Sequence, residues 1–95
     1  MPNAKMNYAD KDKLGAVVAM LIAFDQKPTR SISIAEVYMD YGAGMKWETI
    51  LVKNSKYDSS FQLLSPRQWD EIDHADTPEA LAKIATELLA VLKNH

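Results

Sequence analysis

Hydrophobic residues follow two patterns along this chain: broad apolar arcs near both ends and shorter alternating segments in the middle. The alternation in the middle predicts an antiparallel meander of three strands. We expect the strands at Ile32–Asp40, Met45–Lys53 and Ser60–Leu64, with a hairpin turn at Tyr41–Gly44 between the first two. The two glycines of this turn can adopt the positive φ values that a tight hairpin requires.

The first of these strands carries a competing helical signal. Ser33 and Glu36 have the spacing of a capping box, and the apolar residues that follow also fit an amphipathic helix. The β-branched and aromatic content of the segment favours a strand. Its apolar positions change phase between Ile34 and Val37, which predicts a β-bulge near Ala35–Glu36. We expect a strand, and a helix over the same residues is the alternative.

Three helices are expected around the meander, and the first covers the apolar run from Leu14 to Phe24. Asp10 can cap it, because a carboxylate accepts hydrogen bonds from the free amides of a first helical turn. As a helix the run would be about 16 Å long, against ~30 Å for the hydrocarbon core of a bilayer. Asp10 and Asp12 also argue against a signal peptide, whose first region is basic. We therefore expect a buried helix.

A stripe of small residues follows one side of this helix. Gly15, Ala19 and Ala23 recur every four residues, which lets another backbone approach closely. The partner would be a helix of the same chain or, in a dimer, the same helix of a second copy. We favour packing within the chain, with the dimer seam as the alternative.

Two further helices have clear start signals in the last third of the chain. Ser65 can act as N-cap, with a proline after it and Gln68 at the third helical position, which completes a capping box. A short helix through Ile72 should follow. Thr77, before a proline and a glutamate, repeats the signal and predicts a last helix that ends at about Lys93.

Composition narrows the class of protein. The 95 residues are 47% hydrophobic and 25% charged, with a net charge of −2, which is ordinary for a globular domain and offers no general attraction to nucleic acid or anionic membrane. The absence of cysteine excludes disulfides and thiol chemistry and agrees with a cytoplasmic location. We expect a single soluble α+β domain of order α-β-β-β-α-α, a three-stranded antiparallel sheet packed with helices, with residues 1–9 as a flexible tail.

One acidic segment could carry chemistry. Asp70, Asp73 and His74 have helical spacing that could bring them together around a metal ion or leave His74 as a general base. Acidic runs at helix ends are more often solvated, and no second ligand cluster, nucleophile elbow or phosphate-binding loop accompanies this one. We expect no catalytic residue, no metal and no cofactor, and we keep a small enzyme or metal site as the third hypothesis.

A nucleic-acid-associated accessory protein is the second hypothesis. It would use a small basic patch formed by Lys46, Lys53, Lys56 and Arg67. The order α-β-β-β-α resembles the double-stranded-RNA-binding domain in topology. That family has lysines at the start of its last helix, where Asp76-Thr77-Pro78-Glu79 stands here, and these acids would repel phosphates. We therefore do not expect nucleic acid to be the partner.

The first hypothesis is a non-enzymatic interaction module that binds a protein partner or itself, as a homodimer. A three-stranded sheet covered by helices on one face exposes the other, unless the helices cover both. Large apolar residues cluster near the predicted hairpin, and tyrosine, tryptophan and methionine are enriched in interface cores. The predicted interface consists of Tyr38, Tyr41, Met45 and Trp47 as apolar anchors, with Lys46 and Glu48 as rim charges.

Overall fold

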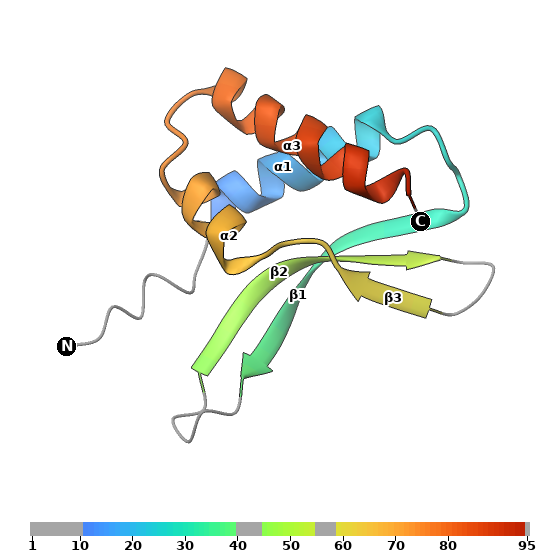
Figure 1. Cartoon of the computed structure of the whole chain (residues 1–95), viewed down its shortest axis with the longest axis horizontal. Coiled ribbons are helices and arrows are strands. Elements are labelled where there is room, and N and C mark those ends of the chain that lie inside the picture. Colours follow the sequence, from blue (N-terminus) through green and yellow to red (C-terminus); the bar gives the residue numbers. More distant parts are fainter. Residues whose placement is uncertain (1–10, 40–44, 55–58, 95) are drawn as a thin grey trace.

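The computed structural model of the chain describes residues 11–39, 45–54 and 59–94, and its fold is α+β with three helices and one three-stranded antiparallel sheet (Figure 1). This confirms the expected fold class and the order α-β-β-β-α-α. The predicted tail, the cap at Asp10 and the hairpin turn lie outside the described residues. The elements are α1 (Lys11–Phe24), β1 (Arg30–Met39), β2 (Met45–Asn54), β3 (Ser59–Gln62), α2 (Pro66–Asp73) and α3 (Pro78–Leu92).

The first two strands form a long, regular hairpin. Their register is continuous from the Arg30–Asn54 pair to the Met39–Met45 pair. The predicted helix alternative over this segment and the predicted bulge near Ala35 are therefore both wrong. The apolar positions change phase because the hairpin carries apolar residues on both faces, with Ile34 and position 37 on opposite sides of an unbroken strand.

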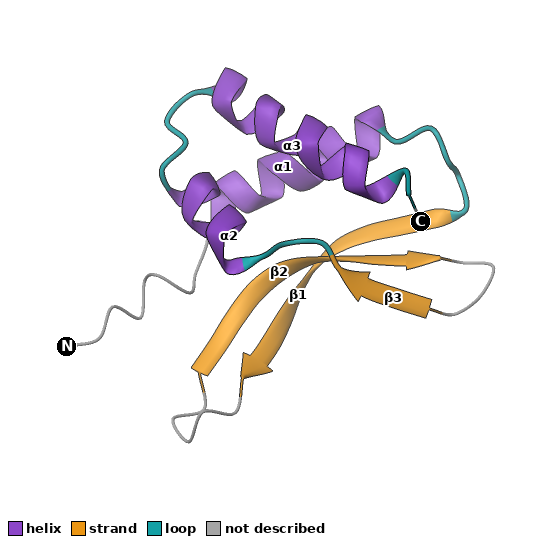
Figure 2. Ribbon diagram, viewed as in Figure 1, coloured by secondary structure: helices purple, strands orange, loops and turns teal. Residues whose placement is uncertain are grey.

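The third strand is short and pairs only with residues 51–54 of β2. Beyond it the β1–β2 hairpin continues as a two-stranded ribbon that extends away from the helices, as Figure 2 shows. The chain leaves β3 through Leu63 and Leu64, both buried. The amide of Leu63 still donates to the carbonyl of Ile50 over 3.0 Å, which extends the β2–β3 pairing by one residue.

Both predicted helix starts in the last third of the chain are confirmed. Ser65 and Gln68 form the capping box: the Ser65 amide donates to the Gln68 side chain over 2.8 Å, and the Gln68 amide donates to Ser65 Oγ over 3.3 Å. Thr77 Oγ1 accepts from the amide of Ala80 over 3.1 Å. These bonds satisfy amides that have no partner inside the helix.

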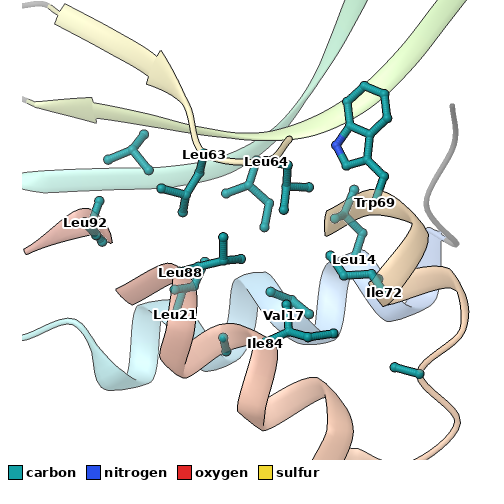
Figure 3. Packing of buried hydrophobic residues seen from close by; sticks show 14 residues of the cluster. Leu14, Val17, Leu21, Leu63, Leu64, Trp69, Ile72, Ile84, Leu88 and Leu92 are labelled. Carbon is teal, nitrogen blue, oxygen red and sulfur yellow. The ribbon is translucent and has the colours of Figure 1, made fainter. Parts of the chain in front are cut away.

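The three helices lie on one side of the sheet, and the hydrophobic core fills the space between (Figures 1 and 3). Helix α1 packs against β1, β2, α2 and α3, so it stands at the centre of the helical layer. No described helix combines the length and apolar composition that a bilayer-spanning helix needs. The fully buried side chains of the core include Leu14, Val17, Leu21, Ile50, Val52, Ile72, Leu88 and Leu92.

The small-residue stripe of α1 is not packed against another part of the described chain at Gly15. A Cβ atom added there would meet no heavy atom within 4 Å. Ala19 and Ala23 are exposed, and the neighbouring Ile22 is 55% exposed. The interpretation of the stripe as an intramolecular packing surface is therefore wrong, and the predicted buried helix is buried on one side only.

Candidate functional site

The predicted hairpin interface lies mostly on residues whose side chains are outside the described part of the structure. The backbone register pairs Tyr38 with Lys46 and Val37 with Trp47, and it pairs the last residue of β1 with Met45. Tyr41 lies outside the described residues altogether. The assignment of apolar anchors at this end of the hairpin therefore stays a prediction.

Glu48 does not have the exposure expected of a rim charge. It is a buried residue at 6% exposure, and Lys11 Nζ lies 3.2 Å from its Oε1. Glu48 is two residues before Ile50 on β2, so alternation places both on the face that meets the helices. The contact joins the first turn of α1 to the middle of the hairpin. The alternation of side chains along the strand already places Glu48 on the same face as Ile50, and the prediction of a rim residue did not take this into account.

The acidic segment does not assemble into a metal site. His74 forms the C-cap of α2, and its Nδ1 lies 2.9 Å from the backbone oxygen of Asp70. The backbone oxygen of Asp73 accepts from Lys13 Nζ over 2.8 Å, which links α1 to the end of α2. Within the described ranges, no three histidine or acidic side chains are grouped as metal ligands.

The pKa of His74 is nevertheless raised above its usual 6.5. The hydrogen bond to the Asp70 backbone oxygen contributes most, followed by the charge of the Asp70 carboxylate, whose Oδ1 lies 3.4 Å from Nδ1. Because a carbonyl oxygen only accepts, Nδ1 carries a proton in this arrangement. The side chain is exposed and its ring is bonded within its own helix, which is a local capping arrangement.

The predicted basic patch is described only in part. Lys53 near the end of β2 and Arg67 in the first turn of α2 are both exposed. The side chain of Lys46 and all of Lys56 lie outside the described residues. Binding of nucleic acid through these residues stays an untested prediction.

Two surface hollows of the described chain have no serine, threonine or cysteine among the residues that line them. One hollow between α2 and α3 is lined by Glu71, His74, Lys83 and Glu87, together with two alanines and Ile84. Another lies beside Phe24 at the ends of α1 and α3.

A different feature is the outer side of β1, which lies at the edge of the sheet. The strand order is β1-β2-β3, so β1 is an edge strand, and no strand in the described ranges pairs with its outer side. We call residues Arg30–Glu36 along this side the β1 edge. Between its two charged ends the edge has no charge and no proline. Ile34 at its centre is 41% exposed.

The hydrogen-bond phase of the sheet shows which backbone groups face this edge. The carbonyl of Ile50 accepts from Leu63, so the backbone groups of Ile50 point toward β3. In an antiparallel pair the N–H and C=O of one residue point to the same side. Ile34, the partner of Ile50 on β1, therefore directs its own groups outward. Ile32 and Glu36 have the same phase, so the backbone groups of all three residues are directed to the outer side of β1.

Comparison of the chain with protein-family models, with curated proteins and with solved structures gave no match. The residues of the chain itself are therefore the basis for inferring its function.

Proposed function

We infer that the chain is a non-enzymatic interaction module that associates with a second copy of itself. The observation that carries this conclusion is the β1 edge, along which no strand of the described residues pairs. Natural proteins guard edge strands with proline, central lysines, bulges or a covering segment. The β1 edge is uncharged from Ser31 to Ala35, its register is free of bulges, and it spans seven residues of the ten-residue strand β1.

Apolar exposure beside this edge supports the same conclusion. Ile34 is 41% exposed on the face of β1 that meets the helices. Ile22 is 55% exposed on α1, which packs directly on β1 and β2. Pairing of a second chain along the edge would cover backbone groups and apolar side chains together, which is the combination that makes strand addition a stable mode of association.

Sedimentation equilibrium over a wide range of protein concentration tests the proposal. We expect a reversible dimer, and Ile34→Lys should shift the equilibrium strongly toward monomer because it places a charge beside the paired backbone. Val91→Lys is the matched control, since Val91 on α3 is 43% exposed and lies on another element. A strict monomer at every concentration, or equal effects of the two substitutions, would contradict the proposal.

A further inference from the structure

We propose a specific geometry for this association: two copies pair their β1 edges antiparallel about a two-fold axis at Ser33, which joins their sheets into one of six strands. This inference rests on the proposed function, because it specifies the partner surface and the register. The axis pairs Arg30 with Glu36 of the second copy, Ser31 with Ala35, and each Ser33 with its own counterpart. Ile32 lies opposite Ile34 in both halves of the interface.

Charge complementarity favours this register. The segment Arg30–Glu36 has one cation at its start and one anion at its end, separated by uncharged residues. An antiparallel copy centred on Ser33 brings opposite charges together at both ends. The guanidinium of Arg30 donates one bond to the backbone oxygen of Leu92 over 2.8 Å, and its remaining donors leave it able to face a carboxylate. Opposite charges across paired strands are favourable, whereas like charges are not.

The side-chain faces also match. With the axis at Ser33, each isoleucine of one β1 edge lies opposite an isoleucine of the other, on the face that meets the helices. The serines and Ala35 lie opposite one another on the other face. Cross-strand pairs of β-branched residues stabilise a sheet, and here they would bury the exposed part of Ile34 against Ile32.

The backbone phase permits the same pairing. Ile32, Ile34 and Glu36 direct their amide and carbonyl groups toward the open edge, as the bond between Leu63 and Ile50 requires. In the proposed register these outward residues lie opposite one another, so each pair exchanges two N–H···O bonds. Ser33 then faces its counterpart in a non-hydrogen-bonded pair.

Shifting the axis by one residue weakens the match. An axis at Ile34 places Ile32 opposite Glu36, and an axis at Ile32 places Ile34 opposite Arg30. Each of these registers sets a charged side chain against an isoleucine. Among these three neighbouring registers, only the one centred on Ser33 pairs Arg30 with Glu36 and isoleucine with isoleucine on the face that meets the helices.

The position of α1 fits the joined sheet. A two-fold axis perpendicular to the sheet keeps both helical layers on one side. A helix above β1 and β2 lies about one strand spacing from the axis, so the two α1 helices would be ~10 Å apart, near the usual distance between packed helices. The uncovered side of α1 carries Gly15, Ala19 and Ala23, whose small side chains suit such an approach.

Single cysteines test the register directly, because the chain has no cysteine of its own. Ser33→Cys should form a disulfide-linked dimer under mild oxidation by copper-phenanthroline, since residues in a non-hydrogen-bonded pair have Cα atoms ~4.5 Å apart. Ser31→Cys is the control. It faces the same side of β1 and is also exposed, yet it would be ~13 Å from its counterpart. A mixture of Ser31→Cys with Ala35→Cys should cross-link between the two variants.

The outcomes separate the two proposals. If wild-type protein sediments as a dimer but Ser33→Cys cross-links no better than Ser31→Cys, the register is wrong and self-association stands. Cross-linking between Ser31→Cys and Ser33→Cys, or between Ser33→Cys and Ala35→Cys, would likewise overturn the register in favour of a shifted one. If the wild-type chain is monomeric throughout, both proposals fail.

Charge reversal gives a second measurement that needs no oxidation. Glu36→Lys would set a lysine against Arg30 at both ends of the interface and should raise the dimer dissociation constant about three- to tenfold. Glu87→Lys is the control, because it makes the same charge change at an exposed position on α3. Equal effects of the two reversals would show that net charge, and not the pairing of strand ends, controls association.

Discussion

Ile34 and Ile50 are the same residue in the same sheet, and they are direct partners across β1 and β2. Ile50 is 0% exposed, whereas Ile34 is 41% exposed. They stand on the same face, so strand propensity and side-chain orientation cannot account for the difference. The cause is lateral position: at Ile50, β2 has β1 on one side and the continuation of β3 at Leu63 on the other, whereas in the described part of the chain β1 has a neighbouring strand on one side only.

A second identical pair repeats the contrast. Glu36 and Glu48 are also partners across the two strands, and Glu48 is buried under Lys11 while Glu36 is exposed. The molecule therefore has a covered column along β2 and an uncovered column along β1. The first column holds the fold together, and the second is the one that we propose to be covered by a second copy.

The largest expected effect on the free energy of unfolding comes from a substitution in the covered column along β2. Ile50→Ala should lower the free energy of unfolding by about 2–5 kcal/mol, because it removes buried methyl groups and leaves a cavity in a packed core. Ile34→Ala should cost less than about 1 kcal/mol in the monomer, because water already reaches that side chain. Urea denaturation at protein concentrations where the chain is monomeric measures both. If the two substitutions lowered the free energy of unfolding equally, Ile34 would be as well packed as Ile50, and the contrast between the covered and uncovered columns would be wrong.

Local signals in the sequence predicted the elements well for a physical reason. The capping box at Ser65 and the cap at Thr77 are formed by neighbours within a few residues. Strand and helix periods likewise reflect short-range geometry. Fold class and element order followed from these signals, and the structure confirms them.

The candidate site could not be predicted in the same way, because it depends on which strand has two neighbours. Ile34 and Ile50 lie in similar alternating segments, and nothing local marks the first as an edge residue. The phase change after Ile34 suggested a bulge, whereas the strand is regular and has apolar positions on both faces. The burial of Glu48 and the open space beside Gly15 depend on how α1 crosses the sheet, which is tertiary information.

The same contrast between covered and uncovered positions can be tested on the helices with substitutions that enlarge a side chain. Ala85 on α3 is 0% exposed, so Ala85→Leu should cost about 1–3 kcal/mol by overpacking. Gly15→Ala on the uncovered side of α1 should instead stabilise the monomer by about 0.5–1 kcal/mol, because glycine is a poor helix residue and the new methyl group meets no described residue within 4 Å. Thermal unfolding of the dilute protein measures both, and a loss at Gly15 would indicate a close neighbour.

The ion pair between Lys11 and Glu48 should contribute less than either packing change. Glu48 is covered, but the Lys11 side chain is 77% exposed, so water screens the attraction. We expect a coupling of about 0.2–1 kcal/mol in a double-mutant cycle with Lys11→Ala and Glu48→Gln. A coupling of several kcal/mol would mean that the pair is shielded from solvent far more than its exposure indicates.

The smallest expected effect concerns His74, which lies at the end of α2, away from both columns. Its folded-state pKa is raised above 6.5 by the Asp70 backbone oxygen and then by the Asp70 carboxylate. The protonated form therefore stabilises the fold below pH 6.5, and that contribution is lost as the pH rises through the raised folded-state pKa.

An NMR titration of His95→Gln, which leaves His74 as the one histidine of the chain, should show a pKa above 6.5. Asp70→Asn should lower that pKa only in part, because the backbone oxygen stays in place. A pKa at or below 6.5 in the parent chain would show that the C-terminal cap of α2 is not held in solution, whereas the edge and the core would be unaffected by that result.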